Sequence, residues 1–579
     1  MSATLLAIAA LCAARVQADP ALGSDPQRAL LAEEVRHHRD DLHLPDAPPL
    51  YHLRYHLLAL QQASVVAAFG AVISREMSPA TVLGTEVRVG SPAFDNTGYG
   101  GWESGFGRLG LPEELTARAL RQATWRLTDS TYKEAVEQYA RKKAAFIPPP
   151  DYPGDYQVGL HQEGPYVSVA SARLEPVEQI ARRVSAAFPV DGGLELGTVL
   201  AAWETGTETV VDSEGTNLQR PHAEFVLRAM AQARAADGAL LSDHRSWYLR
   251  DPAQLPPRDA IDLDVAAMTR DLLAWTRVAP LQEEYVGPVV FEDEAAVDLF
   301  RTLLVDQLEG TPPPVPFDAS FGAVGDGFTF ADDGSGGGPR LNRRVLPDDW
   351  EVVDDPRADL DDPACFAFDL EGTPSQRVAL VEDGIVRTLL MSRVPRKGIP
   401  GGSNGHARGP VGTRAAGRVS HLQVSPKRHL TRRRLLRHAF EIAEAYDHDY
   451  VMVVRRFQDD LVRAEDRTDS GAFSFLEEGG RRLPVPLALY RVYTNGREEP
   501  LRGAAFASVD RWVLREISAA GPQVEGRYLA PFAPGGQSYA PLVGLPTTLS
   551  VPEVLVEELE LVPVNPDPRS RPAVPAPGR

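Results

Sequence analysis

Hydrophobic and polar positions follow helical spacing in some segments of the first 280 residues and alternate in others. Alternation over 50–70 runs into the apolar stretch Val65–Phe69, which is typical of a strand. Between two helical segments, Asp129 and Ser130 are expected to form an N-cap. Together the patterns predict helices over 26–43, 112–123, 131–145, 174–188, 236–248 and 264–276, and strands over 50–70, 82–89, 194–205, 208–212 and 218–230.

From residue 285 onward the pattern changes to short strands and turns. A strand over 286–291 leads into an amphipathic helix over 292–308, whose acidic first turn suits the helix dipole. One more helix is expected over 431–445, followed by a strand over 450–454. The fold class is therefore α+β, with a mixed α/β N-terminal domain over 19–280 and an antiparallel, β-rich, barrel-like C-terminal domain over 285–562.

Both ends of the chain differ from the two domains. Residues 1–18 hold the apolar run Leu5–Ala14 followed by Val16-Gln17-Ala18, which is typical of a cleaved signal peptide, although no basic residue precedes the run. The mature protein is then expected to begin near Asp19 and to be periplasmic or secreted, with a cytoplasmic location as the alternative. The run is shorter than the roughly 20 residues that cross a bilayer, so no membrane span is expected. Residues 563–579 are rich in proline and are expected to form a loose tail.

Charge and cysteine content exclude several classes of protein. The 80 acidic residues outnumber the 60 basic ones, which gives a formal net charge of −20. An acidic chain is poorly suited to binding a phosphate backbone, so nucleic acid is not an expected partner. The 2 cysteines exclude a disulfide scaffold and a cysteine-rich zinc module.

Four segments, in this order and spacing, resemble a known family. They are Val211-Asp212-Ser213-Glu214-Gly215; Gly287–Phe291 with Glu294–Gly310; Asp369-Leu370-Glu371-Gly372-Thr373-Pro374 with Leu380–Gly384 and Ser403-Asn404-Gly405-His406-Ala407-Arg408; and Gly535-Gly536-Gln537 with Gly544-Leu545-Pro546. The chain thereby resembles the TldD/PmbA family, also known as the modulator of DNA gyrase family. Residues 49–55 and 88–96 resemble a branch of it that is often exported.

This resemblance implies a two-domain subunit of a dimer, classically a heterodimer in which only one subunit carries the metal. Active members bind the metal through an HExxxH helix and a cysteine near the C-terminus, and they cleave unfolded peptides. The helix matches residues 299–310 here, so the two histidines and the glutamate fall on Arg301, Asp306 and Thr302. The cysteine falls on Phe532.

These four side chains do not make a catalytic metal centre. Arg301 carries a permanent cation and no free lone pair, so it cannot ligate a dication. The hydroxyl of Thr302 is too weak a base to deprotonate a metal-bound water. Asp306 alone could ligate, and Phe532 has no ligand atom. We therefore expect no catalytic residue, no metal and no cofactor in this chain, and zinc only in a catalytic partner.

The glycine-rich loop offers candidate substrate-binding residues. Asn404, His406 and Arg408 match the loop on the substrate side of the family's site, so the resemblance implies that they hold peptide backbone. The alternative is ordinary turn chemistry, since glycine favours turns.

Two further features have plain structural interpretations. Cys365 lies in a strand-like apolar run and is expected in the core. The basic run over 427–438 is expected to be a solvated helix face.

Three functions remain open. The first is a metal-free subunit that shapes a peptide cavity, as a homodimer or as a heterodimer with a TldD-type subunit, and binds unfolded peptides. The second is a stand-alone exported peptide-binding protein. The third is an active metallopeptidase whose ligands lie elsewhere in the chain.

Overall fold

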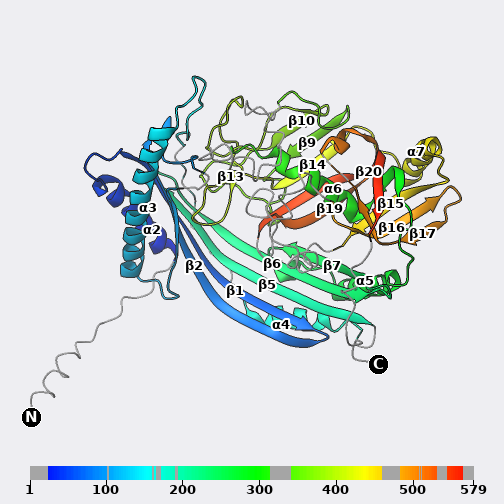
Figure 1. The fold of residues 1–579 in the computed structure, drawn as a ribbon. Coiled ribbons are helices and arrows are strands. Elements are labelled where there is room, and N and C mark those ends of the chain that lie inside the picture. The colour runs from blue at the N-terminus through cyan, green and yellow to red at the C-terminus, as the bar shows by residue number, and fades with distance from the viewer. Residues whose placement is uncertain are drawn as a thin grey trace, which may run out of the picture.

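The structure is a computed structural model that describes residues 24–100, 104–159, 162, 164, 171–189, 193–312, 341–458, 483–507, 509, 511–530 and 544–564. The predicted signal peptide and almost all of the predicted tail lie outside these residues. Two large sheets dominate the molecule (Figure 1). Within the described part of the chain, no helix is long and apolar enough to cross a membrane.

The first sheet has seven strands in the order β3-β2-β1-β5-β6-β7, with β4 paired to β2. All of its pairings are antiparallel. The sequence pattern correctly places β1 and parts of β2 and β6, but it divides β5 into two strands and wrongly predicts a helix where β7 lies. Continuous pairing with β6 keeps both β5 and β7 extended. The strands are β1 (Leu50–Ala68), β2 (Ala71–Ser91), β3 (Phe94–Asp95), β4 (Phe106–Gly110), β5 (Leu194–Asp212), β6 (Asn217–Arg234) and β7 (Leu240–Leu249).

The helices of this domain are α2 (Ser24–Asp41), α3 (Ala117–Ala145), α4 (Leu174–Ser185) and α5 (Arg258–Trp275), with a short 3₁₀ turn at Pro252–Gln254. The prediction that a cap at Asp129 and Ser130 divides α3 is wrong. The Asp129 carboxylate pairs with Lys133 at 2.7 Å, one turn further along. The Ser130 hydroxyl donates to the carbonyl of Leu127 at 3.0 Å, so both side chains are satisfied within a continuous helix.

The two faces of the first sheet carry different chemistry. Strand residues alternate between faces, and one set packs against the helices in two apolar clusters. Helices α2 and α3 cover one end of that face, and α4 and α5 cover the other. The C-terminal domain lies over the opposite face (Figure 1). That face, called the polar face below, includes Arg54, His56, Gln62, Glu204, Glu208, Arg220, His222 and Glu224.

The C-terminal domain is built on an eleven-stranded sheet in the order β11-β10-β9-β14-β20-β8-β15-β16-β17, with β18 and β19 paired to β20. Helix α6 (Asp293–Leu303) packs into the main core on one face, and α7 (Arg432–Ala443) packs on the other. The strands are β8 (Tyr285–Phe291), β9 (Trp350–Asp354), β10 (Val378–Glu382), β11 (Ile385–Val386), β14 (His421–Pro426), β15 (Tyr450–Phe457), β16 (Pro486–Tyr493), β17 (Glu498–Leu501), β18 (Ala504–Phe506), β19 (Ile517–Ala530) and β20 (Leu545–Pro563), and β12 (Ala407–Arg408) pairs with β13 (Ala416–Gly417) in a small separate sheet.

The prediction of a β-rich second domain is confirmed, but its barrel-like closure is wrong. The sheet is open, with β11 and β17 at its two ends. Two pairings, β14 with β20 and β15 with β8, are parallel, whereas the others are antiparallel. Parallel neighbours need a crossover connection, which a simple antiparallel barrel does not contain. The predicted helix over 292–308 also ends early, and a 3₁₀ turn over Val305–Leu308 follows α6.

The backbones of the two domains come into close contact where β2 meets the loop that carries Gly412. A Cβ atom added to Gly84 of β2 would lie 2.5 Å from the backbone nitrogen of Gly412 in the C-terminal domain. Gly412 has a φ of +74°, and a Cβ there would lie 2.5 Å from the carbonyl oxygen of Gly107. No side chain larger than hydrogen fits at either position without moving the domains apart.

Glu553 of β20 makes stability depend on pH. Its carboxyl is buried, and burial together with the nearby Glu292 raises its pKa to about 7. Because this pKa lies above the unfolded value of about 4.3, the folded state holds the proton more tightly. The contribution of Glu553 to stability is then greatest below pH ~4, falls as the pH rises toward 7 and levels off above it.

We therefore expect Glu553→Gln to stabilise the protein at pH 8 by about 1–2 kcal/mol and to have little effect at pH 4.5. Urea unfolding at the two pH values measures this difference. Glu557→Gln, at an exposed position of the same strand, is the matched control and should show no such dependence. An equal effect of Glu553→Gln at both pH values would contradict the raised pKa of Glu553.

Candidate functional site

Helix α6 carries the residues that match the family's metal helix. Arg301, in its last turn, pairs with Asp298 at 3.0 Å, and its guanidinium carbon lies 5.4 Å from the centre of the Tyr528 ring. Thr302 follows in the same helix, and Asp306 lies in the 3₁₀ turn after it. Phe532 lies outside the described residues. The guanidinium that is predicted to replace a metal ligand is thus paired with a carboxylate of its own helix.

The buried phenol of Tyr528 lies beside this position. Burial raises the pKa of its phenol far above the usual range, although the nearby Arg301 acts in the opposite direction. Its hydroxyl makes no hydrogen bond within the described part of the chain. Close by, Glu309 accepts a 2.5 Å bond from Arg418, so that carboxylate already has a cationic partner.

The residues at this position do not fit a catalytic dication. A guanidinium has no lone pair to donate, and its charge repels the metal. Across the residues that the structure describes, no three His, Cys, Asp or Glu side chains are grouped so as to hold a metal ion. We therefore derive no step of chemistry through a metal in this chain.

Two predicted substrate-binding residues, Asn404 and His406, are bonded within their own domain. The Asn404 amide donates to the Leu389 carbonyl at 2.9 Å and accepts from the Met391 amide at 2.8 Å. The ring of His406 is fully buried, with Nε2 3.0 Å from Asp354 and Nδ1 3.0 Å from the Asn404 carbonyl. These contacts hold the glycine-rich loop in place.

Burial of Asp354 acts to raise its pKa, but hydrogen bonds from His406 and Ser420 leave that pKa below the usual range. An ionised carboxylate in the core thus depends on the histidine beside it.

Arg408, the third predicted substrate residue, links three segments. It is buried and donates to the carbonyls of Val419 and Pro546, at 2.6 and 2.7 Å. Burial lowers its pKa to about 10. Its guanidinium also lies 5.5 Å from the Phe366 ring. What the structure shows for Asn404, His406 and Arg408 is a role in holding the loop; contact with a substrate stays a prediction.

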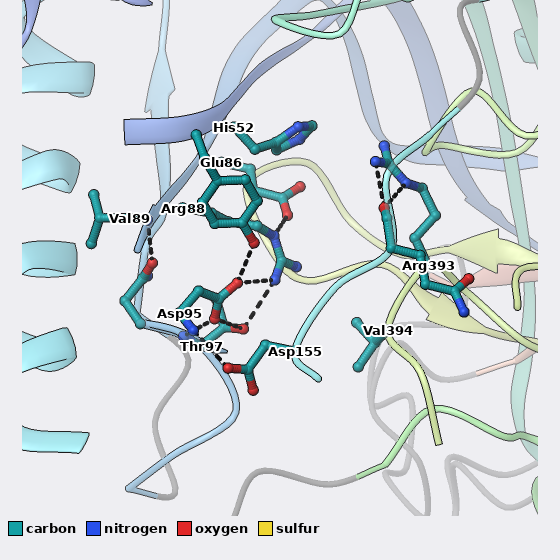
Figure 2. A network of polar contacts seen from close by, with 12 residues as sticks. His52, Glu86, Arg88, Val89, Asp95, Thr97, Asp155, Arg393 and Val394 are labelled. Carbon is teal, nitrogen blue, oxygen red and sulfur yellow. Dashed lines mark hydrogen bonds and ion pairs between the residues drawn. The ribbon is translucent and has the colours of Figure 1, made fainter. Parts of the chain in front are cut away.

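A second polar centre lies where β1 and β2 meet the C-terminal domain (Figure 2). Arg88 is fully buried, and its guanidinium donates to Glu86 at 2.5 Å, Asp95 at 2.9 Å and Thr97 at 3.0 Å. Arg54 forms a second ion pair with Glu86. Burial acts to raise the pKa of Glu86, but the two arginines outweigh it and lower that pKa to about 2. The cluster therefore holds its charges in mutually paired form.

Residues of the C-terminal domain complete this centre. The backbone amide of Arg393 donates to Glu371 at 2.6 Å, and its guanidinium contacts Glu214 in the β5–β6 turn at 2.5 Å (Figure 2 shows the arginine on the facing loop). Burial and the neighbouring Glu371 raise the pKa of Asp369 to about 7. Asp369 also accepts bonds from three backbone amides, at 2.8–3.0 Å, which fix the turn.

The sequence contained a signal for this centre. The turn 211–215 and the segments 88–96 and 369–374 carry the resemblance to the family, and all three meet here. Their role in joining the domains was not predicted, because the chain positions are far apart and no local spacing relates them.

The polar face of the first sheet carries further ionisable side chains. His56 contacts Glu208 at 2.6 Å, and Arg220 pairs with the same carboxylate. Arg220 also donates to the carbonyl of Phe368 at 3.1 Å, across to the C-terminal domain. Glu204 and Glu224 lie opposite each other on neighbouring strands. Burial, with the charge of Glu204, raises the pKa of Glu224 to about 7.

Two plain structural predictions are confirmed. Cys365 is buried, and burial raises the pKa of its thiol to about 11, so the thiol stays protonated near neutral pH. On α7, Arg432 pairs with Glu292 and Glu498, at 2.6 and 3.1 Å, as expected of a solvated basic face beside acidic neighbours.

The fold is shared with several solved structures. A protein described as a modulator of a DNA gyrase from Thermotoga maritima matches with a TM-score of 0.56 at 16% identity, over 92% of this chain and 99% of that one. TldE from Thermococcus kodakarensis matches with 0.54 at 11%, over 92% and 100%. A protein described as a modulator of DNA gyrase from Bacteroides thetaiotaomicron matches with 0.57 at 12%, over 93% and 100%. No curated protein matches the chain.

The sequence comparison agrees with the fold. Residues 284–480 match the PmbA/TldA metallopeptidase C-terminal domain. The molecule is thus a two-domain protein of metallopeptidase-like architecture, with its N-terminal sheet covered by that domain. The C-terminal domain thus matches the PmbA/TldA family model by sequence, and the whole chain shares the fold of these solved structures.

We expect His406→Ala to destabilise the protein by about 1–3 kcal/mol, because the substitution removes a hydrogen-bond partner of the buried carboxylate of Asp354. Urea unfolding measures the loss, with His438→Ala on the exposed face of α7 as the control. Unchanged stability together with weaker peptide binding would contradict the structural role and favour direct contact with substrate.

Proposed function

We propose that this protein is a metal-free subunit of TldD/PmbA type that binds unfolded peptides and assembles with a second subunit. The observation that carries the proposal is Arg301, a cation in the position of a metal ligand, paired with Asp298 and lying beside the ring of Tyr528. A partner with an intact HExxxH helix would supply the zinc and the peptide cleavage. A homodimer without cleavage is the alternative assembly.

The polar face of the first sheet is the proposed peptide-contacting surface. An extended peptide presents backbone N–H and C=O groups that need hydrogen-bond partners once they leave water. His222 and Glu204 lie 3.7 Å apart on this face, and Glu224 is protonated over part of the neutral pH range. These groups can both donate to and accept from peptide backbone without regard to sequence. Asn404, His406 and Arg408 are proposed to hold the loop that faces the peptide, or to touch it.

Two alternative functions remain. A stand-alone exported peptide-binding protein would bind peptides without a second subunit. An active metallopeptidase would need ligands other than Arg301, Thr302, Asp306 and Phe532. For all three functions we propose a periplasmic or secreted location, on the basis of residues 1–18.

We expect the tag-free, dialysed protein to contain far less than one zinc per chain by elemental analysis and to show no chelator-sensitive peptide cleavage. A catalytic zinc needs about three protein ligands and a nearby base. Arg301→His alone should not create a site, whereas Arg301→His, Thr302→Glu, Asp306→His and Phe532→Cys together supply the missing ligands and base. Stoichiometric zinc in the unmodified chain, with cleavage that a chelator stops, would establish the third function instead.

We also expect the chain to associate rather than to remain a 63.0 kDa monomer. Native mass spectrometry with and without an HExxxH-bearing paralogue from the same genome measures this directly. A heterodimer that gains peptidase activity supports the proposal. Monomers in both samples, with peptide binding intact, would support the stand-alone function.

A further inference from the structure

The two ends of the domain junction are held by different kinds of contact. At the end covered by α4 and α5, Leu487 of β16 is buried in the same apolar cluster as Trp275, and the Tyr490 ring lies 5.2 Å from that tryptophan. Two ion pairs between the domains, Asp243 with Arg456 at 3.0 Å and Asp237 with Arg502 at 2.6 Å, accompany this apolar contact. At the end covered by α2 and α3, the apolar cluster contains only N-terminal residues among those described. The contacts with the C-terminal domain there are polar groups and the close backbone approach of Gly84 to Gly412.

A strap formed by residues 146–159 crosses the junction at this polar end. Its N-terminal part is fixed to the first domain, because the Asp155 carboxylate receives bonds from Lys142 and from the Asp95 amide, both at 2.6 Å. The amides of Asp155 and Tyr156 also donate to the carbonyl of Pro92, at 2.9 and 3.1 Å. The Lys142 and Asp155 side chains are almost fully buried, so separating them would leave an unpaired charge in the interior.

Gln157, two residues after Asp155 in the strap, is bonded to the C-terminal domain. The Gln157 amide donates to the Arg393 carbonyl at 2.9 Å, and the Arg393 guanidinium donates back to the Gln157 carbonyl at 2.6 and 2.9 Å. The side-chain oxygen of Gln157 accepts from the Ser403 amide at 3.2 Å. Gln157 thus both donates hydrogen bonds to the C-terminal domain and accepts them from it.

Between the anchor and this joint, Tyr156 contacts one arginine from each domain. The guanidinium carbon of Arg88 lies 3.7 Å from the centre of its ring, and that of Arg393 lies 4.2 Å from it. The phenol hydroxyl is buried and makes no hydrogen bond within the described residues, so the ring itself is the contacting group. Cation–π contacts are stronger in a desolvated site than at an exposed one.

We propose that the strap is a latch: release of Tyr156 from Arg393 lets the domains open about the apolar contact between α5 and β16, which exposes the polar face of the first sheet. Apolar contacts are non-directional and tolerate a change of angle, so they suit a hinge. Hydrogen bonds and stacked guanidinium groups are directional and are lost on a small displacement. Opening also returns the buried guanidinium of Arg393 to water, which offsets part of the lost contact. This inference concerns access to the polar face and stands whether or not the chain has a catalytic partner.

The test is a distance measurement between spin labels on the full chain, with Cys12→Ser and the buried Cys365 retained. The latch pair is Glu137→Cys on α3 with Glu382→Cys on β10, and the hinge pair is Leu263→Cys on α5 with Arg497→Cys in the β16–β17 turn. The unsubstituted side chains at these four positions are exposed. In Tyr156→Ala we expect the fraction of long distances at the latch pair to rise about tenfold, with little change at the hinge pair.

Tyr156→Phe is the matched control, because it keeps the ring and removes only the unpartnered hydroxyl; it should match the unmodified protein. Arg393→Lys keeps the charge but loses the planar stack, and it should widen the same distances even if Tyr156→Ala does not fold. Unchanged distances in every folded variant would overturn the proposal. So would equal widening at both label pairs, since that would indicate general loosening rather than opening about a hinge.

Discussion

Arg88 is fully buried, and a buried guanidinium without partners would be strongly destabilising. Its partners come from successive elements: Glu86 from the same strand, and Asp95 and Thr97 from the segment that follows. Asp95 is held in turn by the strap, through its backbone bond to Asp155. One buried cation therefore connects β2, through Asp95, to the strap.

The domain arrangement places the polar face of the first sheet toward the domain that carries α6. The sheet places its apolar residues under the helices and leaves charged and amide groups toward the C-terminal domain. Helix α6 of that domain carries Arg301, which is paired with Asp298. The proposed peptide-contacting surface therefore faces the domain in which the loss of metal ligands is proposed.

Local pattern predicted most elements because long strands and amphipathic helices have clear periods. The local pattern failed where contacts with other parts of the chain determine the conformation. β7 was predicted as a helix because its alternation is weak, and pairing with β6 overrides that preference. Asp129 and Ser130 suggested a helix start, but both are satisfied inside α3. The barrel-like closure was wrong because pairing order depends on contacts between strands far apart in sequence.

At the site, the proposed substitutions on α6 were inferred from the sequence because the resemblance aligned a single helix. The junction of Arg88, Tyr156 and Arg393 was not, because it joins residues from three distant segments. No period or spacing relates them, and only folding places them together.

The backbone contact between Gly84 and Gly412 has a consequence for how this protein can change over generations. A side chain at either position meets backbone atoms of the other domain or of its neighbours within 3 Å. The two domains are therefore not interchangeable modules. One domain could be transferred to another host chain only if the host also has a glycine at the matching contact position. Recombination among relatives should therefore keep the two glycines together.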